Sequence, residues 1–224
     1  MFLLFLIRLV NFLLLVKKLT NYNKKDIDVG KTPLEIYTIC SCIREAFCLS
    51  YAIRKENNLF LYFQNEGVLI KFEGNTLKYL GPDERSQALL LRKAIDKISL
   101  VNSSNIENWR KSTPGIYIRN FSNNESFIKY LKSFPSFNPI FLINDKDVGK
   151  LNSCLKVNEF ETLNTISEFF YIIPAYNIII EDFNFFQLFK DLKDIKFLTL
   201  SKINSIEDKF LYVNFRLDLL KKQN

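Results

Sequence analysis

Short apolar runs alternate along this chain with longer stretches of helical periodicity. Two of the runs, at residues 139–143 and 169–173, are apolar at nearly every position, which is typical of strands covered on both faces of a sheet. Strands are expected at residues 11–18, 58–64, 68–72, 115–119, 139–143, 169–173 and 197–200. Helices are expected at residues 34–56, 81–98, 123–132, 182–192 and 205–222. This alternation predicts an α/β fold with a mainly parallel sheet and helices on both of its faces.

Polar residues mark the starts of several of these helices. Asp83 and Glu84 follow a Gly-Pro pair and suit the positive end of a helix dipole. Asn123 or Asn124 can cap the helix that runs to residue 132, and Ser205 can cap the last helix. Residues 101–112 are polar and rich in turn formers, which indicates a loop.

The chain of 224 residues contains no histidine, which excludes histidine-based triads, histidine metal ligands and histidine general bases. Four cysteines are too few for a disulfide framework. Cys40, Cys42 and Cys48 fall in one expected helix and Cys154 lies far away, so we expect small buried apolar side chains and no tetrahedral zinc site. Gly149-Lys150 lacks the other residues of a phosphate-binding loop.

The first sixteen residues, MFLLFLIRLVNFLLLV, are strongly apolar but contain Arg8 and Asn11. A helix that spans a membrane needs about 20 apolar residues, and a secretory signal carries its positive charge before the apolar run. We therefore expect a strand near residues 11–18, preceded by a hydrophobic extension at residues 1–10. Membrane contact by this segment is the less favoured alternative.

Basic side chains exceed acidic ones by 31 to 24, a net charge of +7 that permits a polyanionic partner. Arg110, Lys111 and Arg119 gather near Trp109. Basic groups beside an aromatic ring suit an RNA backbone with a stacked base. The alternative for such a group is a solvated surface without a ligand.

Three segments carry a resemblance to a known family. They read CIREAFCLSYAIRK at residues 42–55, GPDERSQALLLRKAI at 81–95 and WRKSTPGIYIR at 109–119. In order and spacing they resemble the archaeal TrmY family, which are tRNA pseudouridine methyltransferases of the SPOUT class. The resemblance extends from about residue 11 to residue 119 and is weaker beyond.

The resemblance implies a single SPOUT-type domain over residues 11–224, with a trefoil knot near the C-terminus. It implies that S-adenosylmethionine is bound in the knot, largely by backbone groups of three loops. It further implies a cytoplasmic homodimer that methylates nitrogen 1 of pseudouridine in the T-loop of tRNA. We expect the dimer interface to include the last helix, residues 205–222, and Arg110, Lys111 and Arg119 to contact RNA.

The resemblance places the cofactor-binding residues at the ends of three strands. Leu142 matches a family leucine in the first loop, and Leu200 and Ser201 stand in the third loop. Pro174 begins the second loop, where the family has a glycine-rich sequence, and Phe210 replaces a family cysteine in the last helix. We expect Leu142, Pro174, Leu200 and Ser201 to line one pocket; the catalytic residues are not identified.

Because proline lacks an N–H and restricts the backbone, the second loop leaves two interpretations open. The first is an active methyltransferase that binds the cofactor less tightly. The second is an inactive paralogue that keeps the fold and serves as an RNA-binding or partner protein.

Overall fold

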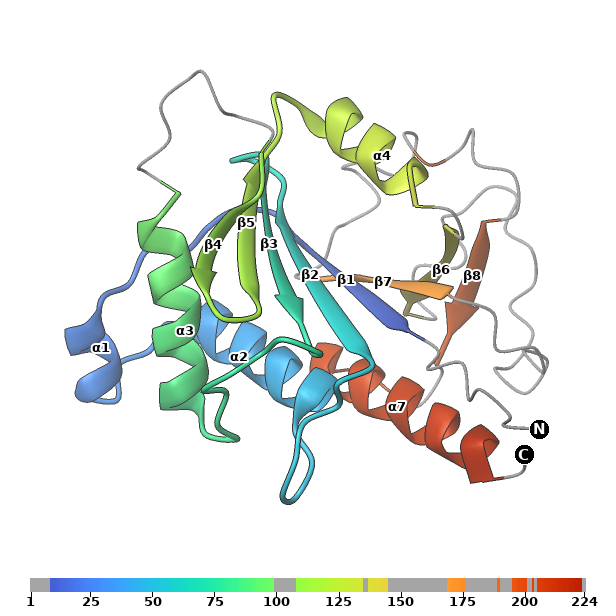
Figure 1. The fold of residues 1–224 in the computed structure, drawn as a ribbon, viewed down its shortest axis with the longest axis horizontal. Helices are drawn as coiled ribbons and strands as arrows, with labels where there is room; N and C mark the ends of the chain where they lie inside the picture. Colours follow the sequence, from blue (N-terminus) through green and yellow to red (C-terminus); the bar gives the residue numbers. More distant parts are fainter. Residues whose placement is uncertain are drawn as a thin grey trace.

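The computed structural model describes residues 9–98, 108–134, 137–144, 169–175, 189, 195–200, 203 and 205–222. Within these ranges an eight-stranded sheet carries five helices (Figure 1). The strands are β1 (Val10–Val16), β2 (Asn57–Phe63), β3 (Val68–Glu73), β4 (Arg110–Thr113), β5 (Ile116–Asn120), β6 (Asn138–Ile143), β7 (Phe169–Pro174) and β8 (Lys196–Thr199). The helices are α1 (Lys24–Asp28), α2 (Leu34–Phe47), α3 (Glu84–Asp96), α4 (Asn124–Lys132) and α7 (Ile206–Lys222).

The α/β fold is confirmed, and the sheet is mixed. Its strand order is β4-β5-β3-β2-β1-β7-β6-β8. Five neighbouring strands are mutually parallel: β2, β1, β7, β6 and β8. Strand β3 is antiparallel to both β2 and β5, and β4 is antiparallel to β5. The chain expected to form the C-terminal knot lies largely outside the described residues.

Strand β1 lies inside the sheet, between β2 and β7, and all seven of its residues are buried. The expected strand near residues 11–18 is therefore confirmed. The strand begins at Val10, which we had expected to be the last residue of the hydrophobic extension. Residues 1–8 are outside the part of the chain that the structure describes. None of the described helices combines the length and the apolar character that crossing a membrane requires.

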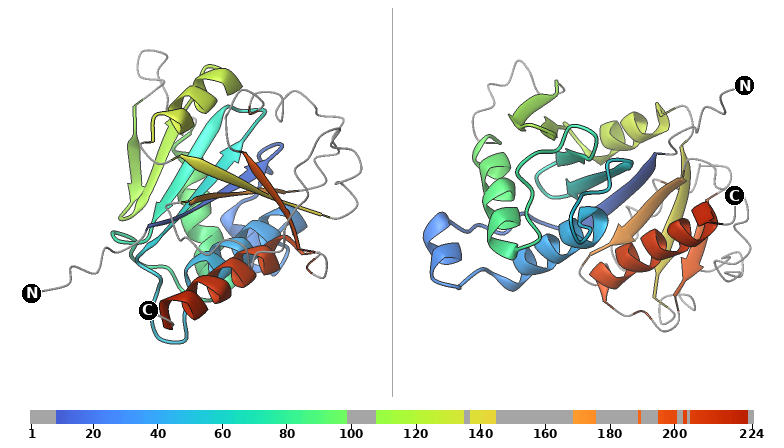
Figure 2. Two further views of the ribbon diagram at one scale, coloured as in Figure 1. Left: turned by 90° about the vertical axis from the view of Figure 1, so that its right-hand side faces the viewer. Right: turned by 60° about the horizontal axis from the view of Figure 1, so that its bottom comes forward.

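Helices cover both faces of the sheet, as Figure 2 shows: α2, α3 and α7 lie on one side and α4 on the other. The strand residues alternate accordingly. Phe12 and Leu14 of β1 belong to the core beneath α2, α3 and α7. Leu13 and Leu15 belong to the second core, together with Phe127 of α4.

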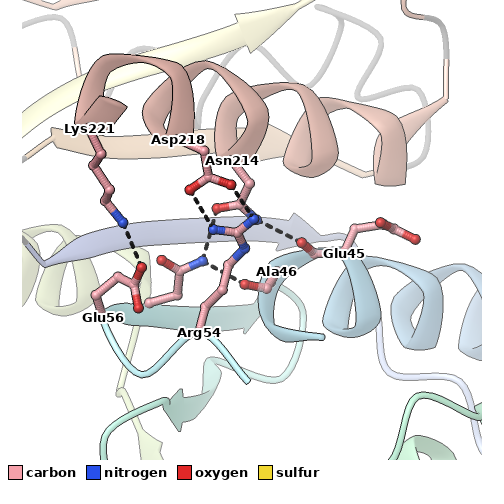
Figure 3. Close-up of polar contacts among 8 residues, drawn as sticks. Glu45, Ala46, Arg54, Glu56, Asn214, Asp218 and Lys221 are labelled. Atoms are coloured by element: carbon pink, nitrogen blue, oxygen red, sulfur yellow. Dashed lines mark hydrogen bonds and ion pairs between the residues drawn. The ribbon is translucent and has the colours of Figure 1, made fainter. Parts of the chain in front are cut away.

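Polar side chains fasten α7 to the end of α2 and to the start of β2 (Figure 3). The buried amide of Asn57 donates through Nδ2 to Ala46 O at 2.6 Å and to Asn214 Oδ1 at 3.0 Å. Asn214 Nδ2 in turn donates to Glu45 O at 2.7 Å. These bonds satisfy carbonyl groups that the end of a helix leaves without partners.

The expected helix starts are confirmed. Asp83 Oδ1 accepts from Ser86 N at 2.8 Å, Asn123 Oδ1 accepts from Ser126 N at 2.8 Å, and Ser205 Oγ accepts from Asp208 N at 3.2 Å. Asp83 is the N-cap of α3, so the preceding proline stands outside the helix.

Three elements differ from the expectation. The helix expected at residues 34–56 ends at Phe47, and a short loop follows that is closed by a bridge between Cys48 and Ile53. Helix α1 was not expected, and β4 begins within residues 101–112, the stretch expected to be a loop. Of the helix expected at residues 182–192, only Phe189 is described.

Candidate functional site

One edge of the sheet gathers the carboxyl ends of six strands. The parallel pairings give β1, β2, β6, β7 and β8 one direction, and β5 shares it because β3 is antiparallel to both β2 and β5. Strand β4 runs the opposite way and therefore begins at this edge. We call it the carboxyl edge; in open α/β sheets, ligands bind at such an edge.

Three of the expected cofactor residues lie at the carboxyl edge, on adjacent strands. Leu142 is the penultimate residue of β6, Pro174 is the last residue of β7, and Leu200 directly follows β8. The side chain of Leu142 is fully buried in the core beneath α7, so the backbone is what this residue offers at the edge. Pro174 is half-buried, and Leu200 is buried.

The other two expected cofactor residues are placed differently. Ser201 lies outside the described residues. Phe210 of α7 is fully buried, and its ring packs on Phe12 of β1 with 4.9 Å between the centroids. Phe210 therefore contributes to the core between α7 and the sheet.

Two polar residues at the carboxyl edge were missed in the sequence. Lys209 of α7 is 3% exposed, and its Nζ donates to Leu142 O at 3.1 Å. Asn144 follows β6, and its buried Oδ1 has no hydrogen-bond partner among the described residues. Lys209 shares the inner face of α7 with Val213, one turn further along, so its position in the helical pattern was the signal for burial.

The expected RNA-binding residues lie on the two outermost strands, and they point to different faces of the sheet. Arg110 of β4 pairs with Ile118 and donates to Lys97 O at 3.0 Å, on the α3 side. Lys111 is exposed and pairs with Tyr117, which points to the other side. The structure thus brings the three residues to one corner of the sheet but not to one face.

Arg119 of β5 lies on the α4 side, among aromatic rings. Its guanidinium carbon is 4.6 Å from the ring centroid of Tyr130 and 5.0 Å from that of Phe121. Burial raises the pKa of Tyr130 to about 12, although the nearby Arg119 opposes the rise. Tyr130 therefore keeps its proton at neutral pH, and the guanidinium of Arg119 lies against neutral rings.

The cysteines of α2 do not offer thiolates. Burial raises the pKa of Cys40 to about 12 and that of Cys42 well above its usual value. Both side chains are buried in the core, as expected for small apolar groups. Cys48, just after the helix, is half-buried, and desolvation raises its pKa as well.

Comparison with known proteins gives a family and several relatives. The family described as "Putative SAM-dependent RNA methyltransferase" matches residues 11–158. Over 103 residues the chain is 38% identical to the tRNA (pseudouridine(54)-N(1))-methyltransferase of Methanocaldococcus jannaschii, which covers 45% of this chain and 49% of that protein. Proteins with the same name from Methanosarcina acetivorans and Haloferax volcanii are 40% identical over 85 residues and 39% identical over 77. Those matches cover 37% and 34% of this chain, respectively, and 37% of each relative. The chain thus spans about half or less of the length of these relatives.

Proposed function

Because the chain belongs to the family of putative SAM-dependent RNA methyltransferases, we propose that it transfers a methyl group from S-adenosylmethionine to nitrogen 1 of pseudouridine in the T-loop of tRNA. The observation that carries this proposal is the carboxyl edge. Leu142, Pro174 and Leu200 end three adjacent parallel strands there. The matched relatives are named for this reaction.

The residues at the carboxyl edge fit the cofactor. The Oδ1 of Asn144 has no partner among the described residues, and it is a hydrogen-bond acceptor, which suits the amino groups of S-adenosylmethionine. Leu200 supplies an apolar side chain at this edge and Leu142 its backbone, with Ser201 next in the chain after Leu200 and Phe210 in the core that also holds the Leu142 side chain. When bound, the cofactor supplies a methyl group already activated by its sulfonium. The protein's task is then to hold the two reacting atoms in line and to assist loss of the proton.

RNA is proposed to reach this edge from the corner formed by β4 and β5. Lys111 and Arg119 lie on the α4 side of that corner and Arg110 on the α3 side. Four strand spacings separate β5 from β7, a distance of about 19 Å. A bound tRNA arm can span this distance, so one RNA molecule can contact both places.

We further propose a homodimer that uses α7. Leu211, Phe215 and Leu219 stand four residues apart on one side of this helix and are 49%, 54% and 37% exposed. The opposite side of α7 is buried against α2 and the sheet. An apolar stripe of this kind suits a second copy of the same chain.

A second candidate function is RNA binding without methyl transfer, and Pro174 favours it. The N–H of Ala175 donates to Leu15 O on the β1 side, whereas the described β6–β7 pairing ends at Phe141 and Ile172. Pro174 lies just past that pairing, where the strand tolerates a residue without an N–H. The loop that begins there lacks one backbone donor that a cofactor could use.

The test is mass spectrometry of nucleosides from unmodified and pseudouridine-containing tRNA after incubation with isotope-labelled S-adenosylmethionine. We expect the label in N1-methylpseudouridine, and its absence contradicts the proposed methyltransferase activity.

Calorimetry with S-adenosylmethionine separates the two candidate functions. A dissociation constant below about 100 μM, which corresponds to a binding free energy of about −5.5 kcal/mol, supports the methyltransferase. Binding of tRNA without binding of the cofactor supports the second candidate. Fractionation of a tagged protein tests the proposed cytoplasmic location.

A further inference from the structure

Trp109, the chain's one tryptophan, lies at the surface directly before β4. It is 36% exposed. Tyr117 of β5 meets its ring edge-on with 6.4 Å between the centroids, and Tyr130 of α4 does so at 6.0 Å. Contacts from two different elements fix the plane of the indole while leaving part of it open. We call Trp109, Tyr117 and Tyr130 the aromatic platform.

The platform is anchored in the second core. Tyr130 contacts Phe134 with 5.2 Å between ring centroids, and Phe134 contacts Phe170 of β7 at 5.1 Å. Arg119 lies against the ring of Tyr130 at 4.6 Å. A surface held in this way is already ordered, so a ligand that stacks on it loses little affinity to the ordering of side chains.

The charge around the platform is positive. Residues 108–134 contain one acidic side chain, Glu125, and five basic ones, of which Arg110 lies on the opposite, α3 side of the sheet. Lys111 is exposed and pairs across the ladder with Tyr117, and Lys129 is exposed on α4, next to Tyr130. An aromatic surface with basic neighbours matches an unpaired nucleotide, whose base stacks while its phosphate meets the lysines.

We propose that the aromatic platform binds an unpaired base of the RNA substrate by stacking on Trp109, at a site separate from the one where methyl transfer takes place. This inference rests on the proposed function for the identity of RNA as the partner. The platform lies on β4, β5 and α4, whereas the cofactor residues lie on β6, β7 and β8, so the stacked base is not the methylated one. Arg119 is a positioning residue here, because its cation supports Tyr130 from within the cluster.

Intrinsic fluorescence tests the stacking directly, since all tryptophan emission comes from Trp109. We expect an unmodified tRNA transcript to quench this emission with the same dissociation constant that anisotropy of labelled tRNA gives. Heparin, a polyanion without bases, should leave the emission unchanged. Binding seen by anisotropy without quenching overturns the platform and leaves the proposed function standing. Equal quenching by heparin also overturns it, and no tRNA binding at all overturns both.

Variants give a second test. Trp109→Ala should weaken tRNA binding about tenfold, whereas Trp109→Phe, which keeps an aromatic face, should stay within about twofold. Tyr51→Ala removes a fully exposed tyrosine of the loop after α2 and should change nothing. Trp109→Ala should leave the salt dependence of binding unchanged, while Lys111→Gln should lower its slope by about one. Equal affinities for Trp109→Ala and the native protein overturn the proposal.

Discussion

Arg54 and Asp218 lie 164 residues apart in the sequence and face each other in a two-pronged ion pair (Figure 3). Arg54 Nη1 donates to Asp218 Oδ1 at 2.8 Å, and Nη2 donates to Oδ2 at 2.6 Å. The arginine side chain is 13% exposed and the aspartate side chain 38%. The pair joins α7 to the loop before β2 and thereby fixes the last helix against the sheet.

Replacing Asp218 by alanine should destabilise the fold, because Arg54 is then left largely buried without this partner. We expect a loss of about 1–3 kcal/mol in the free energy of unfolding, measured with urea. Arg54→Lys is the matched variant. It keeps the positive charge but cannot form the two parallel hydrogen bonds of a guanidinium, so it should lose part of this free energy of unfolding. A free energy of unfolding unchanged by Asp218→Ala contradicts the role given to the pair.

The same region shows why sequence periodicity misplaced the end of α2. Ala52 and Ile53 continue a plausible helical pattern, yet the helix ends at Phe47. Asn57 Nδ2 donates to Ala46 O, and Arg54 N donates to Phe47 O. These bonds depend on how the chain folds back into β2, and a local pattern does not contain that information.

Gly115 forms the turn between β4 and β5 in a conformation that suits glycine. Its φ is +81°, and an added Cβ would lie 2.3 Å from Leu77 Cα. Gly115→Ala should therefore cost about 2 kcal/mol or more in unfolding experiments, since the backbone at Leu77 must move. Gly30 is the matched control: its φ is +69°, but an added Cβ meets nothing within 4 Å, so Gly30→Ala should cost only about 1 kcal/mol. Equal losses for the two variants contradict the steric argument.

The sequence predicted those parts of the candidate site that lie at the ends of strands. The ends of the apolar runs placed Leu142, Pro174 and Leu200 at one edge, and the three strands that carry or precede these residues are neighbours in the sheet. Strand β4 was missed because its sequence, RKST, is polar, as an outer strand allows. Lys209 was missed because a lysine in an amphipathic helix is usually exposed, although its place on the apolar side of α7 indicated burial; its bond to the end of β6 appears only in the folded structure.

The N-cap of α3 should make stability depend on pH. The hydrogen bond from the Ser86 backbone lowers the pKa of Asp83 below its ordinary value. A lowered folded-state pKa adds stability above the unfolded value, about 3.9, and this contribution is lost as the pH falls through the folded value. Asp83→Asn keeps an acceptor but does not titrate. The difference in unfolding free energy between native protein and Asp83→Asn should be constant near pH 6 and shrink below about pH 4; a difference independent of pH contradicts this assignment.

If the exposed apolar side of α7 forms the proposed dimer interface, a polar substitution on that side should weaken the dimer. Phe215 stands in the middle of the exposed stripe, so Phe215→Ser should raise the dimer dissociation constant at least about tenfold. Light scattering at micromolar concentration measures the mass. Leu34→Ser, at an exposed apolar position of α2, is the control and should leave the mass unchanged. A monomeric mass for the native chain argues against the dimer.

Because buried Lys209 contacts the end of β6, its replacement should change the affinity for S-adenosylmethionine more than the free energy of unfolding. Lys209→Met keeps most of the volume of the side chain, which becomes one atom shorter, and removes the donor to Leu142 O, at the strand end where the cofactor is proposed to bind. Methionine has nearly the volume of lysine, and the cost of burying a charge disappears, so we expect these gains to offset the lost bond to Leu142 O and the free energy of unfolding to change little. The end of β6 loses a charged hydrogen bond, so the affinity for S-adenosylmethionine should fall about tenfold, or about 1.4 kcal/mol.

Calorimetry and urea unfolding on the same preparations measure the two effects. Lys221→Met is the control on the same helix: this lysine is half exposed and pairs with Glu56 at 2.7 Å, and its loss should leave cofactor affinity unchanged. Lys209→Met that binds the cofactor as tightly as the native protein shows that the end of β6 does not depend on this bond. A large loss of stability with unchanged affinity assigns Lys209 to the core, because the ammonium then supports the fold and not the site.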